Sequence, residues 1–123
     1  MRRILVATLG ALAVGAACSS SSSEPSGTPD QPGALQVFMQ GSAFNPATRT
    51  VAVGATVTWT NKDGVSHTVT SAAIPAGVNP FGSGSLGANG TYSLAFNQAG
   101  SYGYYCTIHG TPNSGMRGTV IVQ

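Results

Sequence analysis

Three side chains that bind soft metal ions lie close together near the C-terminal end of the chain. Cys106 offers a thiolate, His109 an imidazole and Met116 a thioether. A thiolate, two imidazoles and a weakly bound thioether form the ligand set of type 1 copper sites, and soft sulfur ligands favour copper over magnesium or calcium. The second imidazole must come from elsewhere, and the chain has one other histidine, His67. These four residues therefore predict a copper site, provided that the fold brings His67 to the other three.

Each of these residues has a plainer interpretation as well. A histidine at the start of a strand is usually structural, and Cys106 could be a buried free thiol. Structural zinc usually takes more thiolates or histidine pairs than this chain offers. Met39 is a second thioether, but it lies in an alternating pattern that is typical of a core position. Met116 is therefore the better candidate for the weak fourth ligand.

The candidate ligands lie in a segment that reads as strand, loop and strand. Tyr102, Tyr104 and Cys106 alternate with Tyr105, as side chains do along a strand, so that Tyr105 points to the opposite face. A loop rich in Gly, Pro and Asn follows, and a second alternating run covers residues 119–122. His67 begins a further short strand over residues 67–70. The cysteine and the two histidines meet only if these strands are neighbours.

Alternating apolar residues also organise the chain between residue 34 and the candidate site. They predict strands over residues 34–40, 50–53, 55–61 and 91–96, the middle two joined by a turn at Gly54. Residues 75–90 are rich in Gly and Pro and predict a loop anchored by Phe81 and Leu86. No segment of this part has a helical period. Short strands separated by Gly/Pro turns predict an all-β fold, a sandwich or a barrel.

The first residues predict export. Residues 1–17 hold two arginines, an apolar run and then small residues, which is the pattern of a signal peptide. The apolar run is too short to remain as a membrane span. Gly15-Ala-Ala-Cys18 resembles a lipobox, so we expect lipidation of Cys18 and a position on the periplasmic or extracellular face of a membrane. Ordinary cleavage near Ala17, which would release a soluble protein, is the alternative.

Residues 18–33 are of low complexity, with a run of serines and almost no apolar side chains. Such a segment cannot offset the entropy of ordering and predicts a flexible linker. The folded domain is then expected over residues 34–123. Cys106 is its single thiol, which excludes a disulfide within the domain. An unpaired thiol is a hazard in an oxidising compartment unless a metal ion occupies it.

Charge excludes several kinds of partner. Without the signal, the chain has equal numbers of cationic and acidic side chains: Arg49, Lys62 and Arg117 against Glu24, Asp30 and Asp63. The mature chain is therefore formally neutral before it binds a metal. No basic patch remains that would indicate nucleic acid or an anionic membrane surface as a partner.

The chain resembles the cupredoxins, and within them the plastocyanin and amicyanin group of small blue copper proteins. The matching motifs run in order through residues 34–123: Phe44-Asn-Pro46, Val57-Thr-Trp-Thr-Asn61, His67-Thr-Val-Thr70, Ile74-Pro-Ala-Gly77, Phe81-Gly-Ser-Gly84 with Leu86, Tyr92-Ser-Leu-Ala-Phe96 and residues 100–122. The resemblance implies a Greek-key β-sandwich of about eight strands with one copper ion at one end.

The resemblance also implies roles for individual residues. His67, Cys106, His109 and Met116 would bind the copper ion, and the backbone N–H of Thr68 would help to hold the Cys106 sulfur. The electron would leave through His109, with Tyr105 beside a second path. The surface around His109 would dock redox partners through an apolar patch, defined here as Gly64, Val65, Ile108 and Pro112. The patch contains no charged residue.

Two features depart from the family pattern. Six residues separate His109 from Met116, more than in typical plastocyanin or amicyanin loops. The acidic patch of plant plastocyanins is also missing, because the residues that follow His67 are uncharged. Docking on a photosynthetic partner through negative charge is therefore not expected.

These observations predict a monomeric one-electron carrier that meets its redox partner proteins transiently. The alternative is an extracytoplasmic protein that stores or delivers copper, although delivery sites tend to be open and rich in Met or Cys. A metal-free adhesion module would leave the grouping of Cys106, His109 and Met116 unexplained. An enzyme is disfavoured, since multicopper oxidases and copper nitrite reductases need more histidines for a second copper centre than the two of this chain.

Overall fold

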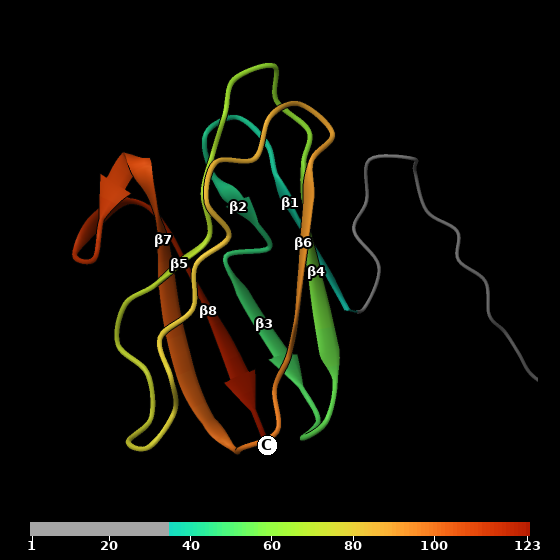
Figure 1. Cartoon of the computed structure of the whole chain (residues 1–123), viewed down its shortest axis with the longest axis vertical. Helices are drawn as coiled ribbons and strands as arrows, with labels where there is room; N and C mark the ends of the chain where they lie inside the picture. Colours follow the sequence, from blue (N-terminus) through green and yellow to red (C-terminus); the bar gives the residue numbers. More distant parts are fainter. Residues whose placement is uncertain (1–34) are drawn as a thin grey trace, which may run out of the picture.

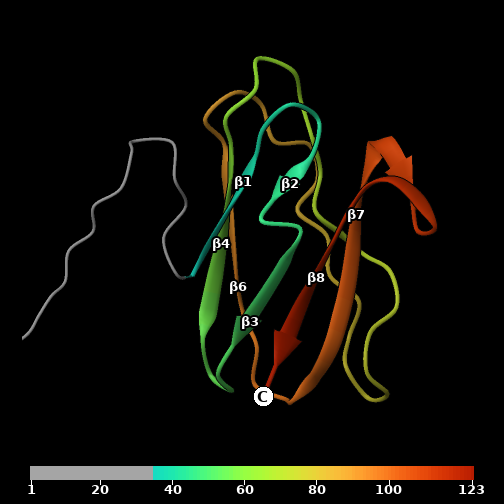
Figure 2. The same cartoon turned by 180° about the vertical axis from the view of Figure 1, so that it is seen from behind.

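The folded part of the chain is a sandwich of two four-stranded β-sheets (Figures 1 and 2). The computed structural model describes residues 35–123. One sheet has the order β2-β1-β4-β6, and its strands are Phe44–Asn45, Gln36–Met39, Thr56–Asn61 and Thr91–Ala95. The other has the order β3-β8-β7-β5, with strands Thr48–Val51, Ser114–Val122, Gly100–Thr111 and Thr70–Ser71. The predicted all-β fold of about eight strands is confirmed for these residues.

The expected signal peptide, the lipidation site Cys18 and the linker over residues 18–33 lie outside the described residues. Within residues 35–123, no helix is long and apolar enough to cross a membrane.

The chain changes sheets twice near its start. It leaves the first sheet at Pro46, between β2 and β3, and returns to it at Gly54, between β3 and β4. As a result, two strand pairs are parallel: β1 pairs with β4, and β3 pairs with β8. The two strands predicted on either side of Gly54 therefore lie in opposite sheets and do not form a hairpin.

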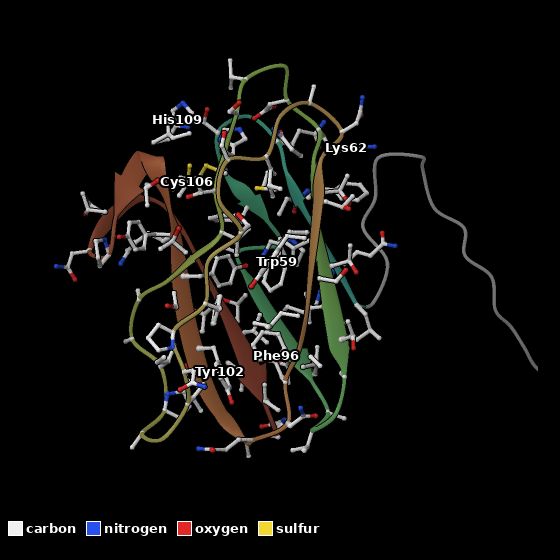
Figure 3. The ribbon with its side chains drawn as sticks, in the orientation of Figure 1. Trp59, Lys62, Phe96, Tyr102, Cys106 and His109 are labelled. Carbon is white, nitrogen blue, oxygen red and sulfur yellow. The ribbon has the colours of Figure 1, made fainter. Side chains whose placement is uncertain are left out.

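The core lies between the two sheets and is rich in aromatic rings. Figure 3 shows Trp59, Phe96 and Tyr102 along the middle of the sandwich. Trp59 lies on β4 and is fully buried, as the alternating pattern predicts. Its ring meets the ring of Tyr104 edge-on, with 5.3 Å between the centroids. Burial of such side chains supplies most of the stability of a small sandwich and makes its two sheets one rigid frame.

The structure differs from the predicted strands on both sides of the candidate site. Residues 67–70 are not a regular strand: His67 forms an isolated bridge with Leu86, and only Thr70 enters β5. The expected loop after Cys106 is instead a continuation of β7 and β8, with irregular pairing between Tyr105 and Gly110. The reason is that backbone pairing across the two strands satisfies the polar groups of a segment whose Gly and Pro content predicts a loop.

The extra residues between His109 and Met116 form the end of a β-hairpin (Figure 1). Gly110 pairs with Gly115 and Thr111 with Ser114, which leaves Pro112 and Asn113 in the turn. The hydroxyl of Thr111 accepts hydrogen bonds from the N–H groups of Asn113 and Ser114, at 3.2 and 3.1 Å. The longer segment is thus an ordered element that returns the chain toward the core.

One core contact depends on the absence of a side chain. Gly118 lies opposite Tyr104 in the β7–β8 pair, and a Cβ atom at position 118 would lie 2.5 Å from Cζ of Tyr104. The ring cannot easily move away, because Tyr104 is 1% exposed and also packs against Phe44 and Trp59.

We therefore expect Gly118→Ala to lower the free energy of unfolding by about 1–3 kcal/mol, the usual cost of overpacking a core. Urea denaturation of the metal-free domain measures this change. Gly87→Ala is the control, since a Cβ there meets nothing within 4 Å. Equal stability of the two variants would show that the Tyr104 ring is not held against Gly118.

Candidate metal centre

The side chains of His67, Cys106 and His109 converge at one end of the sandwich, where Figure 3 labels Cys106 and His109. The Nδ1 atoms of the two histidines are 3.1 Å apart. The Cys106 sulfur is 3.8 Å from Nδ1 of His67 and 3.7 Å from Nδ1 of His109. His67 and Cys106 are fully buried, whereas His109 is exposed. The fold thus brings together three of the four predicted ligands.

These three atoms fit a transition-metal ion. A point equidistant from all three lies about 2 Å from each, close to the roughly 2.0–2.3 Å bonds that imidazole nitrogen and thiolate sulfur form with such ions. Two imidazole nitrogens and one thiolate around a common centre form the trigonal ligand set of type 1 copper.

The surroundings of Cys106 favour its thiolate form. Burial raises the pKa of its thiol, but hydrogen bonds outweigh this effect and lower the pKa to about 6. The backbone N–H of Thr68 donates to the sulfur at 3.4 Å, and His109 and His67 contribute further contacts. The thiolate, which is the form that binds metals, therefore predominates at neutral pH.

The segment that carries His67 is clamped on two sides. On one side, His67 exchanges two backbone hydrogen bonds with Leu86, at 3.0 and 2.7 Å. On the other, the hydroxyl of Thr68 accepts a hydrogen bond at 2.9 Å from the N–H of Thr107, the residue that follows Cys106 in β7. This clamp fixes the distance between His67 and Cys106, although the segment is not a regular strand.

Asn61 supports the same segment and was missed from the sequence. It is fully buried at the end of β4, where its amide nitrogen lies 2.8 Å from the carbonyl of Val65 and 2.9 Å from that of Leu86. Its side-chain oxygen accepts the N–H of Asp63 at 2.8 Å. A buried amide therefore organises the turn before His67. In the sequence, Asn61 reads only as the last residue of the strand predicted over residues 55–61 and of one family motif.

Asp63 was also missed as a site residue. Its Oδ2 atom is 2.7 Å from Nε2 of His67, the ring nitrogen that faces away from Cys106. The pKa of this carboxyl is lowered, first by the backbone N–H of Ser42 and further by that of Gly41 and by His67. A signal existed in the sequence: Asp63 precedes His67 by four residues across a turn, and carboxylates often orient histidines that bind metals.

Met116 and His109 are brought close by the hairpin. An added Cβ at Gly110, the residue after His109, would lie 2.6 Å from the backbone nitrogen of Met116. Met116 is buried and belongs to the same core cluster as Cys106, as does Met39.

The exposed ring of His109 is held on one side only. Within residues 35–123, Nε2 of His109 has no hydrogen-bond partner.

The remaining predicted residues lie around this end of the molecule or beside β7. Tyr105 is half-buried and pairs with Arg117 across the β7–β8 ladder. Val65 and Ile108 are 53% and 51% exposed, and Gly64 is exposed beside Val65. Pro112 is at the hairpin turn, where it lines a groove with Ala72 and Arg117.

Comparison with known proteins agrees with this geometry. The sequence pattern of the family described as "Copper binding proteins, plastocyanin/azurin family" matches residues 34–123. The chloroplastic plastocyanin of Tetradesmus obliquus is 44% identical over 86 residues, which cover 65% of this chain and 58% of that protein.

Solved structures give the same result. The reduced state of a single-site mutant of amicyanin has a TM-score of 0.64 at 35% sequence identity, covering 74% of this chain and 83% of that one. A copper-containing nitrite reductase from Thermus scotoductus SA-01 also has a TM-score of 0.64, at 28% identity, but the match covers only 25% of that longer chain.

The family match extends over all described residues, and the converging His67, Cys106 and His109 side chains supply the expected donors. The chain therefore belongs to the plastocyanin/azurin family of copper-binding proteins, and its metal is copper.

Proposed function

We propose that the protein is a one-electron carrier with a single type 1 copper site. The observation that carries this proposal is the trigonal arrangement of one thiolate and two imidazoles inside a rigid sandwich. When bound, copper supplies the redox chemistry by alternating between Cu(II) and Cu(I). The protein's part is to hold three ligands in one geometry that suits both states, so that little has to move when the electron arrives or leaves.

The ligands divide this work according to their burial. His67 and Cys106 are enclosed by the core, which excludes water from the thiolate. The exposed ring of His109 is the point at which a partner can come within reach of the site, and we assign it the electron path. Tyr105 lies next to Cys106 on the outer face of β7, and we assign it a second, longer electron path. The N–H of Thr68 donates a hydrogen bond to the Cys106 sulfur and so limits the electron density that the thiolate would give to the metal.

We assign the weak fourth ligand to Met116. The support is the hairpin, which returns the chain so that Met116 follows directly on the pairing partner of Gly110. Met39, by contrast, lies on β1 in the other sheet and pairs with Phe44. A weakly bound axial thioether would tune the reduction potential of the site without controlling its colour.

A catalytic role needs groups that this chain lacks. Its two histidines both belong to the one site, so a second copper centre would require another subunit. Copper storage or delivery is the remaining alternative. The fully buried thiolate and the single site favour electron transfer over that alternative.

We further propose that the protein acts outside the cytoplasm, held to a membrane through lipidated Cys18. The linker over residues 18–33 would let the domain range on the order of 20 Å from its anchor. Its partners are then redox proteins that it meets transiently as a monomer. Nucleic acid is not among them, since residues 35–123 hold only three cationic side chains.

The copper site itself is tested by spectroscopy. Cu(II) added to the purified domain should give an intense blue charge-transfer band and a narrow copper hyperfine splitting, because both arise from a covalent bond to the Cys106 thiolate. Cys106→Ser should abolish both signals. A wild-type protein that binds Cu(II) without colour would contradict the electron-carrier proposal and favour copper storage.

The assignment of the thioether is tested by paired substitutions. Met116→Leu should keep the blue band and raise the reduction potential, since a weak donor is lost while the trigonal ligands stay. Met39→Leu, a change of the same size at another buried position, should alter neither. Voltammetry and visible spectra measure both properties, and sensitivity at Met39 alone would transfer the assignment to that residue.

Docking through the apolar patch is tested by electron self-exchange between oxidised and reduced copies, followed by NMR line broadening. The wild-type rate should change little with salt, because so few charges provide little steering. Val65→Ser should slow exchange about three- to tenfold, since each apolar group removed from a contact costs about 0.8 kcal/mol per CH₂. The reduction potential should not change.

Val53→Ser is the matched control for Val65→Ser. Val53 is equally exposed, at 52%, but it lies in the β3–β4 turn at the opposite end of the sandwich (Figure 1). A steep salt dependence of the wild type, or equal effects of the two substitutions, would rule out the apolar patch as the docking surface.

A further inference from the structure

Asp63 joins the turn between β1 and β2 to the buried histidine. Its Oδ1 atom accepts the N–H of Gly41 at 2.8 Å. Its Oδ2 atom accepts the N–H of Ser42 at 2.9 Å and is 2.7 Å from Nε2 of His67. Asp63 is also the single acidic side chain of residues 35–123. All of the negative side-chain charge of the folded domain, apart from the Cys106 thiolate, is therefore at this contact.

The turn that holds Asp63 adopts a costly conformation. Gly41 and Ser42 have φ angles of 67° and 56°, in the left-handed region that residues other than glycine seldom enter. Consecutive N–H groups in such a turn converge on one point and form an anion-binding concavity. The carboxylate of Asp63 occupies it, which offsets the cost of the left-handed Ser42.

Asp63 is thus fixed independently of His67. Its carboxylate is held by Gly41 and Ser42, and its backbone N–H is held by Asn61. A carboxylate that is fixed in this way can determine the orientation of a ring that contacts it, since it has no freedom to follow the ring. This direction of control separates Asp63 from an ordinary surface partner of a histidine.

We propose that Asp63 is a positioning residue for copper, and this inference rests on the copper site of the proposed function. Its carboxylate keeps the proton of the neutral His67 ring on Nε2. Nδ1, which is 3.8 Å from the Cys106 sulfur, then carries the lone pair that a metal needs. The bond also fixes the ring angle, so the buried ligand is set before copper enters.

The two histidines of the site differ in this respect. Nε2 of His109 has no hydrogen-bond partner among residues 35–123, and the ring is exposed. Asp63 therefore makes His67 the fixed ligand and leaves His109 as the adjustable one. Its negative charge also favours Cu(II) over Cu(I), because the oxidised ion carries one more positive charge.

The first test measures copper affinity by competition with chelators. Asp63→Ala should lower the affinity for Cu(II) about 10- to 100-fold, the usual effect of removing a carboxylate behind a metal-binding histidine. The affinity for Cu(I) should fall less. Each tenfold difference between the two losses raises the reduction potential by about 59 mV. An Asp63→Ala variant with wild-type affinities and potential would overturn the proposal.

Asp63→Asn separates position from charge. An amide can place its oxygen at the Oδ2 position, which keeps the contacts with His67 and Ser42 and loses only the one with Gly41. We expect this variant to recover part of the Cu(II) affinity while its potential stays raised. An Asn variant that binds as weakly as the Ala variant would contradict a positioning role.

The second test uses NMR of the metal-free wild-type protein at about pH 8 and needs no substitution. The ¹⁵N shifts of His67 should show the Nε2–H tautomer alone, with its proton protected from exchange by Asp63. A proton on Nδ1 of His67 would overturn the proposal, whether or not the variants fold. Ser42→Gly, which keeps the N–H and permits the same φ, should retain both the tautomer and the copper affinity within about twofold.

These outcomes remain distinct from those of the proposed function. A colourless wild-type copper complex would contradict the electron-carrier proposal. Affinity and tautomer would still report on Asp63 in that case. A blue wild type whose Asp63→Ala variant is unchanged would overturn only the inference about Asp63.

Discussion

The structure depends on one contact, the attachment of the segment over residues 67–70 to the Cys106 end of β7. The thiolate and the first imidazole come from positions 39 residues apart, yet they must lie within bonding distance of one ion. Two hydrogen bonds with Thr68 make this attachment: its N–H donates to the Cys106 sulfur, and its hydroxyl accepts the N–H of Thr107. The sandwich provides the rigid frame that keeps both segments at that distance.

The site is built asymmetrically, and this asymmetry suits an electron carrier. His67 is buried and held through Asp63, Asn61 and Leu86, whereas His109 lies exposed next to the irregular part of the β7–β8 ladder. The buried side limits the movement of the ligands, and the exposed side brings the site within reach of a partner. A protein that releases copper would gain little from a fully buried thiolate whose pKa is lowered to about 6.

The hairpin shows why pattern and structure disagree around a loop. Gly, Pro and Asn between His109 and Met116 are typical of a loop. Their preference for turns is met in part, since Pro112 and Asn113 form the turn of the hairpin. Their neighbours pair because the two strands were already aligned by the ladder from Gly100 to Tyr105. Long-range alignment thus extended β7 and β8 beyond the limits that local composition predicts.

Local patterns in the sequence are enough to predict the all-β fold class, the buried face of most strands and three donors that the structure groups together, His67, Cys106 and His109. Side-chain chemistry and the two-residue period of strands are local properties, which is why these predictions are possible. Which segments meet depends on the packing of the whole domain. It separated β3 from β4, made His67 a bridge residue, and placed the carboxylate of Asp63 against Nε2 of His67. The physical reason is that these contacts depend on side chains and backbone groups of distant segments, such as Gly41 and Ser42, whose partners no local pattern specifies.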